Sequence, residues 1–442
     1  MTDVYYFISD LHVGGDEQLE QVDFLDELLA FLRKLEERDE DAELIINGDA
    51  FGLWEFTEVD GPEKFDALLD RYPELFDQFE ATGREIPITF IPGNHDYELA
   101  AYPEYVERLA EYNVTLEREV SIERTVGDSL VHVEHGMQED PNNRIPDFGN
   151  PYANPPGYFV NRQITSRAGR LSDRGKYNWL KDIQAVTPMT EIPDWLISNY
   201  FYREMSSWLR FSVMPFLLLF NVGVLYVAIF ALDWFDVWSL PLTLVEELLG
   251  FFGPAGQLVE LVLAGNLVII VLMLAISIPL AVFVWDARKT LRRFGLVRSP
   301  TDREPVEKYL DRARGVFASE PRVAVYVYGH THRPSATAVD GRLVINTGTW
   351  LKRLHRVDPL LGVLPPVYYA SYQLNYFRLS AADDGDVLVE YHVIEKSDPD
   401  DETWLQRLVT RSPRRQRDLP DRTVVNRPRE RDSQLDESEV TD

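Results

Sequence analysis

The sequence predicts an α/β fold with a parallel sheet at its core, interrupted by a two-helix transmembrane hairpin. Short apolar runs that resemble buried strands alternate with segments whose apolar residues recur at helical spacing. This strand–helix–strand order is typical of a parallel sheet. Two later runs carry no charged residue over the length that a helix needs to cross a bilayer.

The composition excludes several classes of protein. The 442 residues include 73 Asp+Glu, 44 Lys+Arg and no Cys, with a formal charge of −29. An acidic surface disfavours general nucleic-acid binding. It suits a halophilic protein, which stays soluble in high salt, although an ordinary acidic protein with an acidic tail is the alternative. Without Cys, any metal must be held by His, Asp, Glu or Asn.

The first two predicted strands each end in residues that could bind a metal. Residues Val4–Ser9 are followed by Asp10 and His12, and residues Glu43–Ile46 are followed by Asp49. The segment between the two runs has helical periodicity. Because ligands bind at the carboxyl ends of strands in open α/β sheets, these three side chains are candidate site residues.

The third predicted strand ends in three polar residues. The apolar run Ile86–Ile91 stops at a Pro-Gly turn signal and is followed by Asn94, His95 and Asp96. Turn residues thus leave three polar side chains at the tip of a buried strand.

Two more strands end in histidine. Leu130–Glu134 is followed by His135, and Val323–Tyr328 is followed by His330 and His332. Residues i and i+2 of an extended chain point the same way, so His330 and His332 can present two ligands to one point.

A basic cluster follows an irregular loop after His135. It is formed by Arg162, Arg167, Arg170 and Arg174. Guanidinium groups bind phosphate in a bidentate manner, so the cluster is a candidate substrate-phosphate site. The alternative is a solvated helix face, or neutralisation of acidic neighbours.

The predicted transmembrane hairpin consists of Phe211–Leu232 and Leu261–Trp285, of 22 and 25 uncharged residues. Each run is long enough to cross the roughly 30 Å hydrocarbon core of a bilayer. Each contains one Asn, at 221 and 266, which we expect to face the partner helix. Two core helices of a large soluble domain are the alternative.

Charge distribution predicts the orientation of the hairpin. The connecting segment 233–260 has five acidic residues and no Lys or Arg, whereas basic residues lie just outside both runs. Because positive residues stay on the cytoplasmic side, the catalytic part and both termini are expected to be cytoplasmic, in a two-pass protein of the cell membrane.

The C-terminal part has two predicted closing strands, Tyr372–Leu379 and Val387–Ile394. From Ser397 the chain is rich in Asp, Glu, Arg, Ser and Pro and is expected to be disordered, apart from a short helix near Trp404–Val409. The predicted segments are a first core part (1–140), a loop and helical cap with the basic cluster (141–210), the hairpin (211–285), a second core part (286–396) and the charged tail (397–442).

The residues at the strand tips form a candidate metal site. Carboxylates and neutral imidazoles bind Mn²⁺, Fe or Zn²⁺. Two such ions can activate a shared water and hold a phosphoryl oxygen for in-line displacement. The candidate ligands are Asp10, His12, Asp49, Asn94, His135, His330 and His332.

In chain order the motifs read D-x-H, G-D, G-N-H-D, H and G-H-x-H, and they resemble the five motifs of calcineurin-like metallophosphoesterases. The resemblance covers residues 4–137 and 323–395. It implies a two-sheet β-sandwich flanked by helices, with two divalent metal ions, of which Mn²⁺ is the first expectation. One ion would be held by Asp10, His12, Asp49 and His332, and the other by Asp49, Asn94, His135 and His330.

The resemblance also implies the roles of two further residues. His95 would contact the phosphoryl oxygen or protonate the leaving group, and Asp96 would orient His95. The stretch G-D-A-F-G-L-W from Gly48 is similar to UDP-2,3-diacylglucosamine pyrophosphatases, which cleave a lipid-linked diphosphate at the membrane surface. That subfamily has Arg in place of His95, so this chain has the general phosphoesterase pattern there.

The sequence therefore predicts a membrane-anchored, dinuclear-metal phosphohydrolase. Its expected partners are membrane lipids and a phosphorylated substrate, with a lipid-linked phosphoester or diphosphate as the first hypothesis. The alternatives are a tethered phosphodiesterase or nucleotidase for soluble substrates, and a catalytically inactive membrane scaffold.

Overall fold

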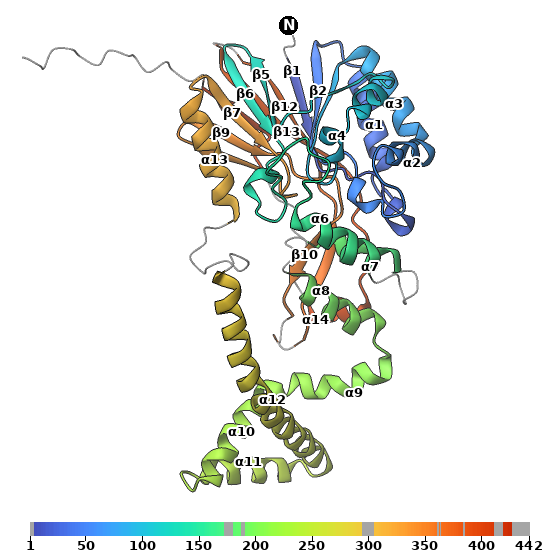
Figure 1. Cartoon of the computed structure of the whole chain (residues 1–442). Coiled ribbons are helices and arrows are strands. Elements are labelled where there is room, and N and C mark those ends of the chain that lie inside the picture. The colour runs from blue at the N-terminus through green and yellow to red at the C-terminus, as the bar shows by residue number, and fades with distance from the viewer. Residues whose placement is uncertain are drawn as a thin grey trace, which may run out of the picture.

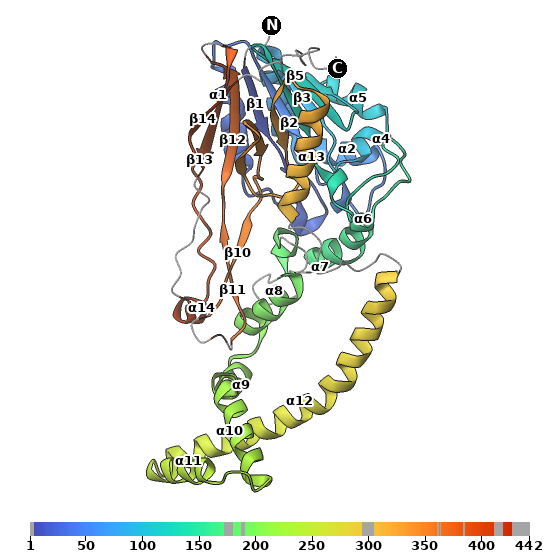
Figure 2. The ribbon, with the colours of Figure 1, turned by 90° about the vertical axis from the view of Figure 1, so that its left-hand side faces the viewer.

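The computed structural model describes residues 4–171, 180–186, 191–293, 305–359, 362, 364–382, 385–410 and 419–426. Two β-sheets pack face to face, with helices on their outer faces (Figure 1). A helical cap lies at one end of the sheets, and a group of apolar helices lies beyond it (Figure 2).

The first sheet has seven strands in the order β14-β13-β12-β1-β2-β3-β4. Strands β1 to β4 are mutually parallel, whereas β12, β13 and β14 continue the sheet antiparallel beside β1. The strands are β1 (Val4–Ile8), β2 (Ala42–Asn47), β3 (Ile88–Ile91), β4 (Val114–Leu116), β12 (Leu374–Ala381), β13 (Val387–Ile394) and β14 (Arg422–Val425).

The second sheet has five strands in the order β5-β6-β7-β9-β8. Its central strands β6, β7 and β9 are parallel, so their carboxyl ends lie at one edge. The strands are β5 (Ser121–Val126), β6 (Ser129–Glu134), β7 (Val323–Tyr328), β8 (Ser335–Val339) and β9 (Arg342–Asn346).

The alternation of side chains along β1 explains how this strand packs between the second sheet and the helices. In β1, Tyr5 and Phe7 face the second sheet, whereas Val4, Tyr6 and Ile8 pack against helices. A strand that buries both faces needs a continuous apolar run, and this is what the sequence of β1 provides. Both parts of the chain, before and after the apolar helices, contribute strands to each sheet.

Helices cover both outer faces of the two sheets. Those that pack on the first sheet are α1 (Leu25–Glu36), α2 (Glu63–Arg71), α3 (Pro73–Glu85), α4 (Glu98–Ala101) and α5 (Glu104–Ala110). Helix α13 (Pro305–Ser319) packs on the outer face of the second sheet. Three short 3₁₀ turns, η1 (Glu17–Glu20), η2 (Leu53–Glu55) and η3 (Met137–Glu139), lie in the loops after β1, β2 and β6.

The cap is a series of short helices between the core and the apolar helices. It contains α6 (Pro156–Val160), the π-helical turn η4 (Asn161–Thr165), α7 (Ser166–Arg170), η7 (Lys181–Ala185), α8 (Ile192–Asn199) and the π-helical turn η9 (Tyr200–Glu204). A hairpin of β10 (Arg353–Val357) and β11 (Val367–Ser371) packs against its second half.

The predicted two-helix hairpin is not confirmed. Among the described residues, one helix is long and apolar enough to span a membrane, the Pro254–Asp286 part of α12 (Pro254–Arg293), whose most apolar 18-residue window has a mean hydropathy of 3.1. Helices α9 (Ser207–Leu218) and α10 (Phe220–Trp234) meet at 48° and make a second span only if the bent pair counts as one. Between α10 and α12 lies a further helix, α11 (Leu240–Phe251).

The break between α9 and α10 lies at Leu219, where the backbone leaves helical geometry. Asn266 of α12 is buried, packs on Gly223 and donates to the carbonyl of Phe216. Asn266 therefore faces its partner helices as predicted, whereas the predicted counterpart at position 221 is exposed.

The prediction of a disordered tail is wrong for part of residues 397–426. Strand β14 pairs antiparallel with β13 at the sheet edge, and α14 (Trp404–Val409) buries Leu405 against the cap and β11. The short helix predicted near Trp404–Val409 is therefore present, whereas the polar composition concealed strand β14.

Candidate functional site

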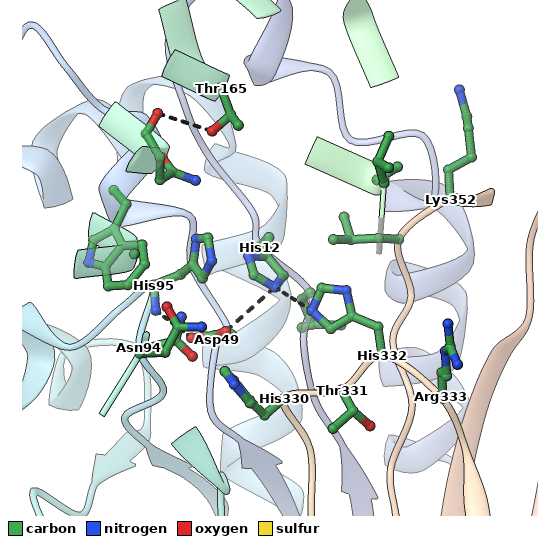
Figure 3. A pocket seen from close by; sticks show the side chains of 18 of the residues that line it. His12, Asp49, Asn94, His95, Thr165, His330, Thr331, His332, Arg333 and Lys352 are labelled. Carbon is green, nitrogen blue, oxygen red and sulfur yellow. Dashed lines mark hydrogen bonds and ion pairs between the residues drawn. The ribbon is translucent and has the colours of Figure 1, made fainter. Parts of the chain in front are cut away.

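The site begins with five strained residues at the strand ends. Nine described non-glycine residues have positive φ, and five of them are Asp10, His12, Asp49, His330 and His332, with φ between 47 and 65°. Few side chains adopt this region without cost, and such residues cluster at functional sites. The side chains of His12, Asp49, His330 and His332 gather beyond the sheet edge (Figure 3), and Asp10 lies 3.2 Å from His332.

The first cluster consists of Asp10, His12 and His332. The Nε2 atoms of the two histidines lie 3.3 Å apart, and Nε2 of His332 lies 3.2 Å from Oδ1 of Asp10. Two imidazole nitrogens and a carboxylate oxygen thus face one another, as ligands of a shared cation do.

The second cluster consists of Asp49, His135 and His330. Nε2 of His135 lies 3.2 Å from Oδ2 of Asp49. The same Oδ2 atom lies 3.6 Å from Nε2 of His12 in the first cluster. One buried carboxylate oxygen therefore lies between the two groups.

Three of the buried ligand-type atoms lack a hydrogen bond. These are Asp10 Oδ1, Asn94 Oδ1 and His135 Nε2. Buried polar atoms are almost always paired, because leaving one unpaired costs about 1–3 kcal/mol. Unpaired oxygen and nitrogen donors that face one point fit divalent cations, so the residues present suit the metals that the sequence predicts.

Neighbouring groups hold the ligands in place. Nδ1 of His135 lies 2.9 Å from the carbonyl oxygen of Asn47, which fixes the ring and leaves Nε2 toward the site. Nε2 of His330 lies 3.2 Å from Oδ2 of Asp140, which leaves Nδ1 to face a cation. The imidazole of His330 holds the pKa of Asp140 well below its usual range, against the effect of burial.

Glycines permit the close approach of the strand ends. A Cβ on Gly48, whose φ is +81°, would lie 2.2 Å from Nδ1 of His135. A Cβ on Gly93 would lie 2.1 Å from Oδ1 of Asp49. These two positions have no room for a side chain, because the ligands occupy that space.

His95 lies beside the first cluster, and Glu55 orients it. Its Nδ1 lies 2.9 Å from Oε1 of Glu55, and its ring stacks on Trp54 with centroids 4.4 Å apart. Burial alone would lower the pKa of His95, but the carboxylates of Glu55, Asp49 and Asp96 raise it to about 9. These carboxylates favour the imidazolium form of His95, which can donate to a phosphoryl or leaving-group oxygen.

The predicted orienting role of Asp96 is not what the hydrogen bonds show. Its carboxylate accepts backbone N–H groups of Gly93 at 2.6 Å and Ala50 at 2.7 Å, and it joins the turns after β2 and β3. Burial and the neighbouring Asp49 raise the pKa of Asp96 to about 7. The orienting residue that sequence reasoning missed is Glu55, which directly follows the G-D-A-F-G-L-W stretch.

Two histidines of the clusters have opposite pKa shifts. Burial and the nearby His95 lower the pKa of His12 to about 3, so its ring is neutral, as a metal ligand must be. Burial opposes protonation of His135 as well, but Asp49 raises its pKa to about 10. A positive charge is thus favoured beside Asp49, and a bound cation can take the place of that proton.

The clusters open into a cavity of ≈ 660 Å³ between the core and the cap. One wall of this cavity is apolar and is contributed by both parts, with Leu19, Val22, Phe24 and Leu351 from the core and Ile183, Val186 and Ile192 from the cap. Its described basic lining residues are Lys308, Arg333 and Lys352. Lys352 pairs with Asp182 at 3.1 Å and Asp23 at 3.4 Å.

The predicted phosphate-binding arginines do not line this cavity where the chain is described. Arg162 pairs with Asp60 at 3.0 Å, and Arg170 pairs with two acidic side chains of the core at 2.9 and 2.5 Å. Arg167 is exposed, and Arg174 lies outside the described residues. The described part of the cluster neutralises nearby acid, which was the alternative interpretation.

Comparison with protein-family models supplies the assignment. The model of calcineurin-like phosphoesterases matches residues 4–228. The chain belongs to the calcineurin-like phosphoesterase family. This membership identifies it as a hydrolase of the phosphoesterase class, in a family that uses divalent metals, and the two clusters are candidate ligand groups.

Solved structures show only weak likeness to this phosphoesterase. A predicted phosphoesterase from Streptococcus pneumoniae TIGR4 has 11% identity and a TM-score of 0.26, over 88% of this chain and 89% of that chain. A Vps29 double mutant from Entamoeba histolytica has 9% identity and a TM-score of 0.27, over 89% and 93%. Phosphopantetheinyl hydrolase from Mycobacterium tuberculosis has 12% identity and a TM-score of 0.25, over 79% and 90%. No curated protein matches the chain, so the assignment rests on the family model.

Proposed function

We propose that this phosphoesterase is a membrane-anchored phosphohydrolase that uses two divalent metal ions, Mn²⁺ first, to cleave a phosphoester or diphosphate bond of a lipid-linked substrate. One observation carries the proposal of two metals. Oδ2 of Asp49 lies 3.6 Å from Nε2 of His12 and 3.2 Å from Nε2 of His135, each in a different ligand cluster. A carboxylate in this position can bridge two cations.

The geometry supports the ligand groups except for Asn94, which the family resemblance adds to the second group. Asp10, His12 and His332 with Asp49 would hold one ion, and Asn94, His135 and His330 with the same Asp49 would hold the other. The two ions would supply Lewis-acid polarisation of a phosphoryl oxygen and a water of lowered pKa.

The protein's own contribution to the reaction lies around His95. Glu55 and Trp54 fix the orientation of its imidazole, and its raised pKa keeps a proton available at neutral pH. With Nδ1 occupied by Glu55, Nε2 is the nitrogen that can donate to a phosphoryl oxygen or to the departing oxygen. The cap covers the cavity and limits the access of bulk water.

Membrane anchoring is supported by the surface of the apolar helices. The Pro254–Asp286 segment is only 7% buried over its most apolar window, so its side chains need another apolar medium. Large aromatic side chains in this region are also exposed, as in interfacial belts: Trp208, Trp234, Phe235, Trp238, Phe251 and Phe252. We propose the bent α9–α10 pair as the second span, which would place the catalytic part and both termini on the cytoplasmic side.

A lipid-linked substrate is supported by the apolar residues that line the cavity together with His12, Asp49 and Asn94. An apolar chain bound there would leave its phosphate at the clusters. The cap lies between the sheets and the apolar helices (Figure 2). The resemblance to UDP-2,3-diacylglucosamine pyrophosphatases agrees with this proposal, although this chain has His95 where that subfamily has Arg.

Activity assays test the reaction class. Full-length protein in detergent, stripped with a chelator and reloaded with Mn²⁺, is expected to hydrolyse phosphodiester or diphosphate reporters. Asp49→Asn is expected to reduce this activity by more than about 1,000-fold, since it weakens both ligand groups. The exposed Asp39→Asn, the same chemical change away from the site, is the matched control. Wild-type protein that is inert with every divalent metal would favour the inactive scaffold.

A comparison of substrates tests the lipid-linked part. Phospholipid headgroup esters and lipid diphosphates in mixed micelles are expected to turn over faster than nucleotide diesters at equal concentration. Faster turnover of the soluble diesters would contradict this part of the proposal and favour a tethered phosphodiesterase or nucleotidase.

A further inference from the structure

We propose that Asn161, a residue of the cap, positions the His95 imidazole through Glu55, so that docking of the cap completes the catalytic arrangement. The proposal rests on the proposed function only for the chemical role of His95. The geometry itself is independent of substrate and metal.

Two buried side chains, Glu55 and Asn161, form a continuous chain of hydrogen bonds with the partly exposed His95. Oε1 of Glu55 lies 2.9 Å from Nδ1 of His95 and accepts from Nδ2 of Asn161 at 3.0 Å. Glu55 is 4% exposed and Asn161 8%. The same carboxylate oxygen thus meets the catalytic histidine on one side and the cap on the other.

Asn161 is itself held in one orientation. Its Oδ1 accepts from the hydroxyl of Ser166 at 2.8 Å, and Ser166 is fully buried. With Oδ1 occupied, the amide NH₂ group must point toward Glu55. Asn161 begins the π-helical turn η4, a rare conformation that is frequent at functional sites.

A second contact joins the cap to His95. The ring of Tyr158, on α6, packs edge-on against Trp54 with centroids 5.7 Å apart, and Trp54 stacks on His95. Thus two cap residues, on neighbouring turns, reach the two groups that hold His95. Glu55, His95 and Asn161 all line the cavity, so the chain of contacts runs along the substrate site.

The arrangement explains why Glu55 keeps a fixed position. A buried carboxylate needs several donors, and Asn161 supplies one that the core does not. Without it, the carboxylate can rotate away from Nδ1, and the His95 ring then loses the contact that directs Nε2 to the substrate. Hydrolysis forms a bond between phosphorus and the oxygen of a water molecule, which releases one proton, and breaks the P–O bond to the leaving group, whose oxygen takes a proton from Nε2 of His95.

Kinetics on the full-length, Mn²⁺-loaded enzyme test the proposal. Two aryl methyl phosphates are used, one with a 4-nitrophenyl leaving group and one with a phenyl leaving group that depends more on proton donation. Asn161→Ala is expected to lower kcat about 10-fold for the phenyl ester and less for the nitrophenyl ester, with KM changed by less than about 2-fold. Gln163→Ala, an exposed amide on the same turn, is the matched control and is expected to behave as wild type.

A double-mutant cycle separates positioning from general destabilisation. In a His95→Ala background, Asn161→Ala is expected to have no further effect on kcat, because its action passes through His95. An equal loss in both backgrounds, or an equal loss for both leaving groups, would overturn the proposal.

A crystal structure of the Asn161→Ala variant provides a readout that does not depend on activity. We expect the Glu55 carboxylate and the His95 ring to leave the positions that they keep in Gln163→Ala. Unchanged positions would overturn the proposal even in an active enzyme. If the wild-type protein proves inert with every metal, the proposed function fails, but this structural comparison still decides the positioning role.

Discussion

Replacement of Gly48 by Ala tests whether the backbone at the end of β2 is built around the metal ligands. The added Cβ would lie 2.2 Å from Nδ1 and 2.5 Å from Cγ of His135, whereas ordinary contact begins at 3.4 Å. The ring of His135 would have to retreat by about 1 Å, which breaks its 2.9 Å contact with the carbonyl of Asn47. Loss of a hydrogen-bonding group that orients a metal-ligating histidine typically lowers metal affinity by about 10–100-fold.

Gly341→Ala is the matched control for the backbone strain. Gly341 has φ +78°, close to the +81° of Gly48, but a Cβ there meets nothing within 4 Å. Both substitutions force Ala into the left-handed region, which costs about 1–2 kcal/mol. The difference between the two variants therefore isolates the collision with His135.

Isothermal titration with Mn²⁺ and thermal unfolding with and without the metal are the assays. We expect Gly341→Ala to keep wild-type Mn²⁺ affinity while its Tm falls by a few degrees. Gly48→Ala is expected to bind Mn²⁺ about 10–100-fold more weakly and to gain less stability from it. Equal Mn²⁺ affinity in the two variants would refute the reasoning.

Three further predictions follow from the contacts. Arg170→Ala is expected to leave kcat and KM within about 2-fold of wild type and to change stability by less than about 1 kcal/mol, because its partners are exposed acids; a large rise in KM for a phosphorylated substrate would contradict this. Glu134 is buried, which alone would raise its pKa, but hydrogen bonds from His132, Arg312 and Tyr326 lower the pKa to about 2. The ionised Glu134 therefore stabilises the folded state above pH 4.5, and this stabilisation is lost as the pH falls through 2. In acid-unfolding titrations over that range, the free energy of unfolding of wild type should therefore fall by up to about 3 kcal/mol more than that of Glu134→Gln. Parallel curves for the two proteins would contradict this stabilising role of Glu134. Asn266→Ala should destabilise the detergent-solubilised protein by about 0.6–1.7 kcal/mol, since the hydrogen bond to the backbone of α9 is lost; an unchanged unfolding midpoint in a denaturing detergent would contradict this.

The strand tips could be predicted because local chemistry determines them. An apolar run of four to six residues that ends at Asp10, Asp49 or His135 is visible in the sequence, and parallel strands bring their carboxyl ends to one edge. The left-handed backbone conformations of Asp10 and Asp49 were not predicted. Positive φ at a His or Asp is rare, and only the tertiary structure reveals that it is needed.

The orienting role was assigned to the wrong carboxylate. Asp96 follows His95 directly, but its carboxylate folds back onto the N–H groups of Gly93 and Ala50, as short acidic side chains in turns do. Glu55 precedes His95 by 40 residues and reaches it only because β2 and β3 are neighbours in the sheet. The E directly after the G-D-A-F-G-L-W stretch was the available signal.

The apolar and terminal regions show a different limit of sequence reasoning. Absence of charge predicts where apolar helices lie, but the first run bends by 48° at Leu219, and hydropathy alone does not register the bend. Strand β14 pairs with the edge strand β13 mainly through its backbone, so composition gave no sign of it. The basic cluster looked unusual in an acidic chain, and the structure shows acidic partners for Arg162 and Arg170.

Anomalous X-ray scattering at the manganese edge, on crystals of the full-length protein loaded with Mn²⁺, tests the central claim most directly. The account predicts two peaks, about 3.5–4 Å apart, that share the carboxylate of Asp49. One is expected beside His12 and His332 and the other beside His135 and His330. A single peak, no peak, or two peaks that do not share Asp49 would contradict the dinuclear centre.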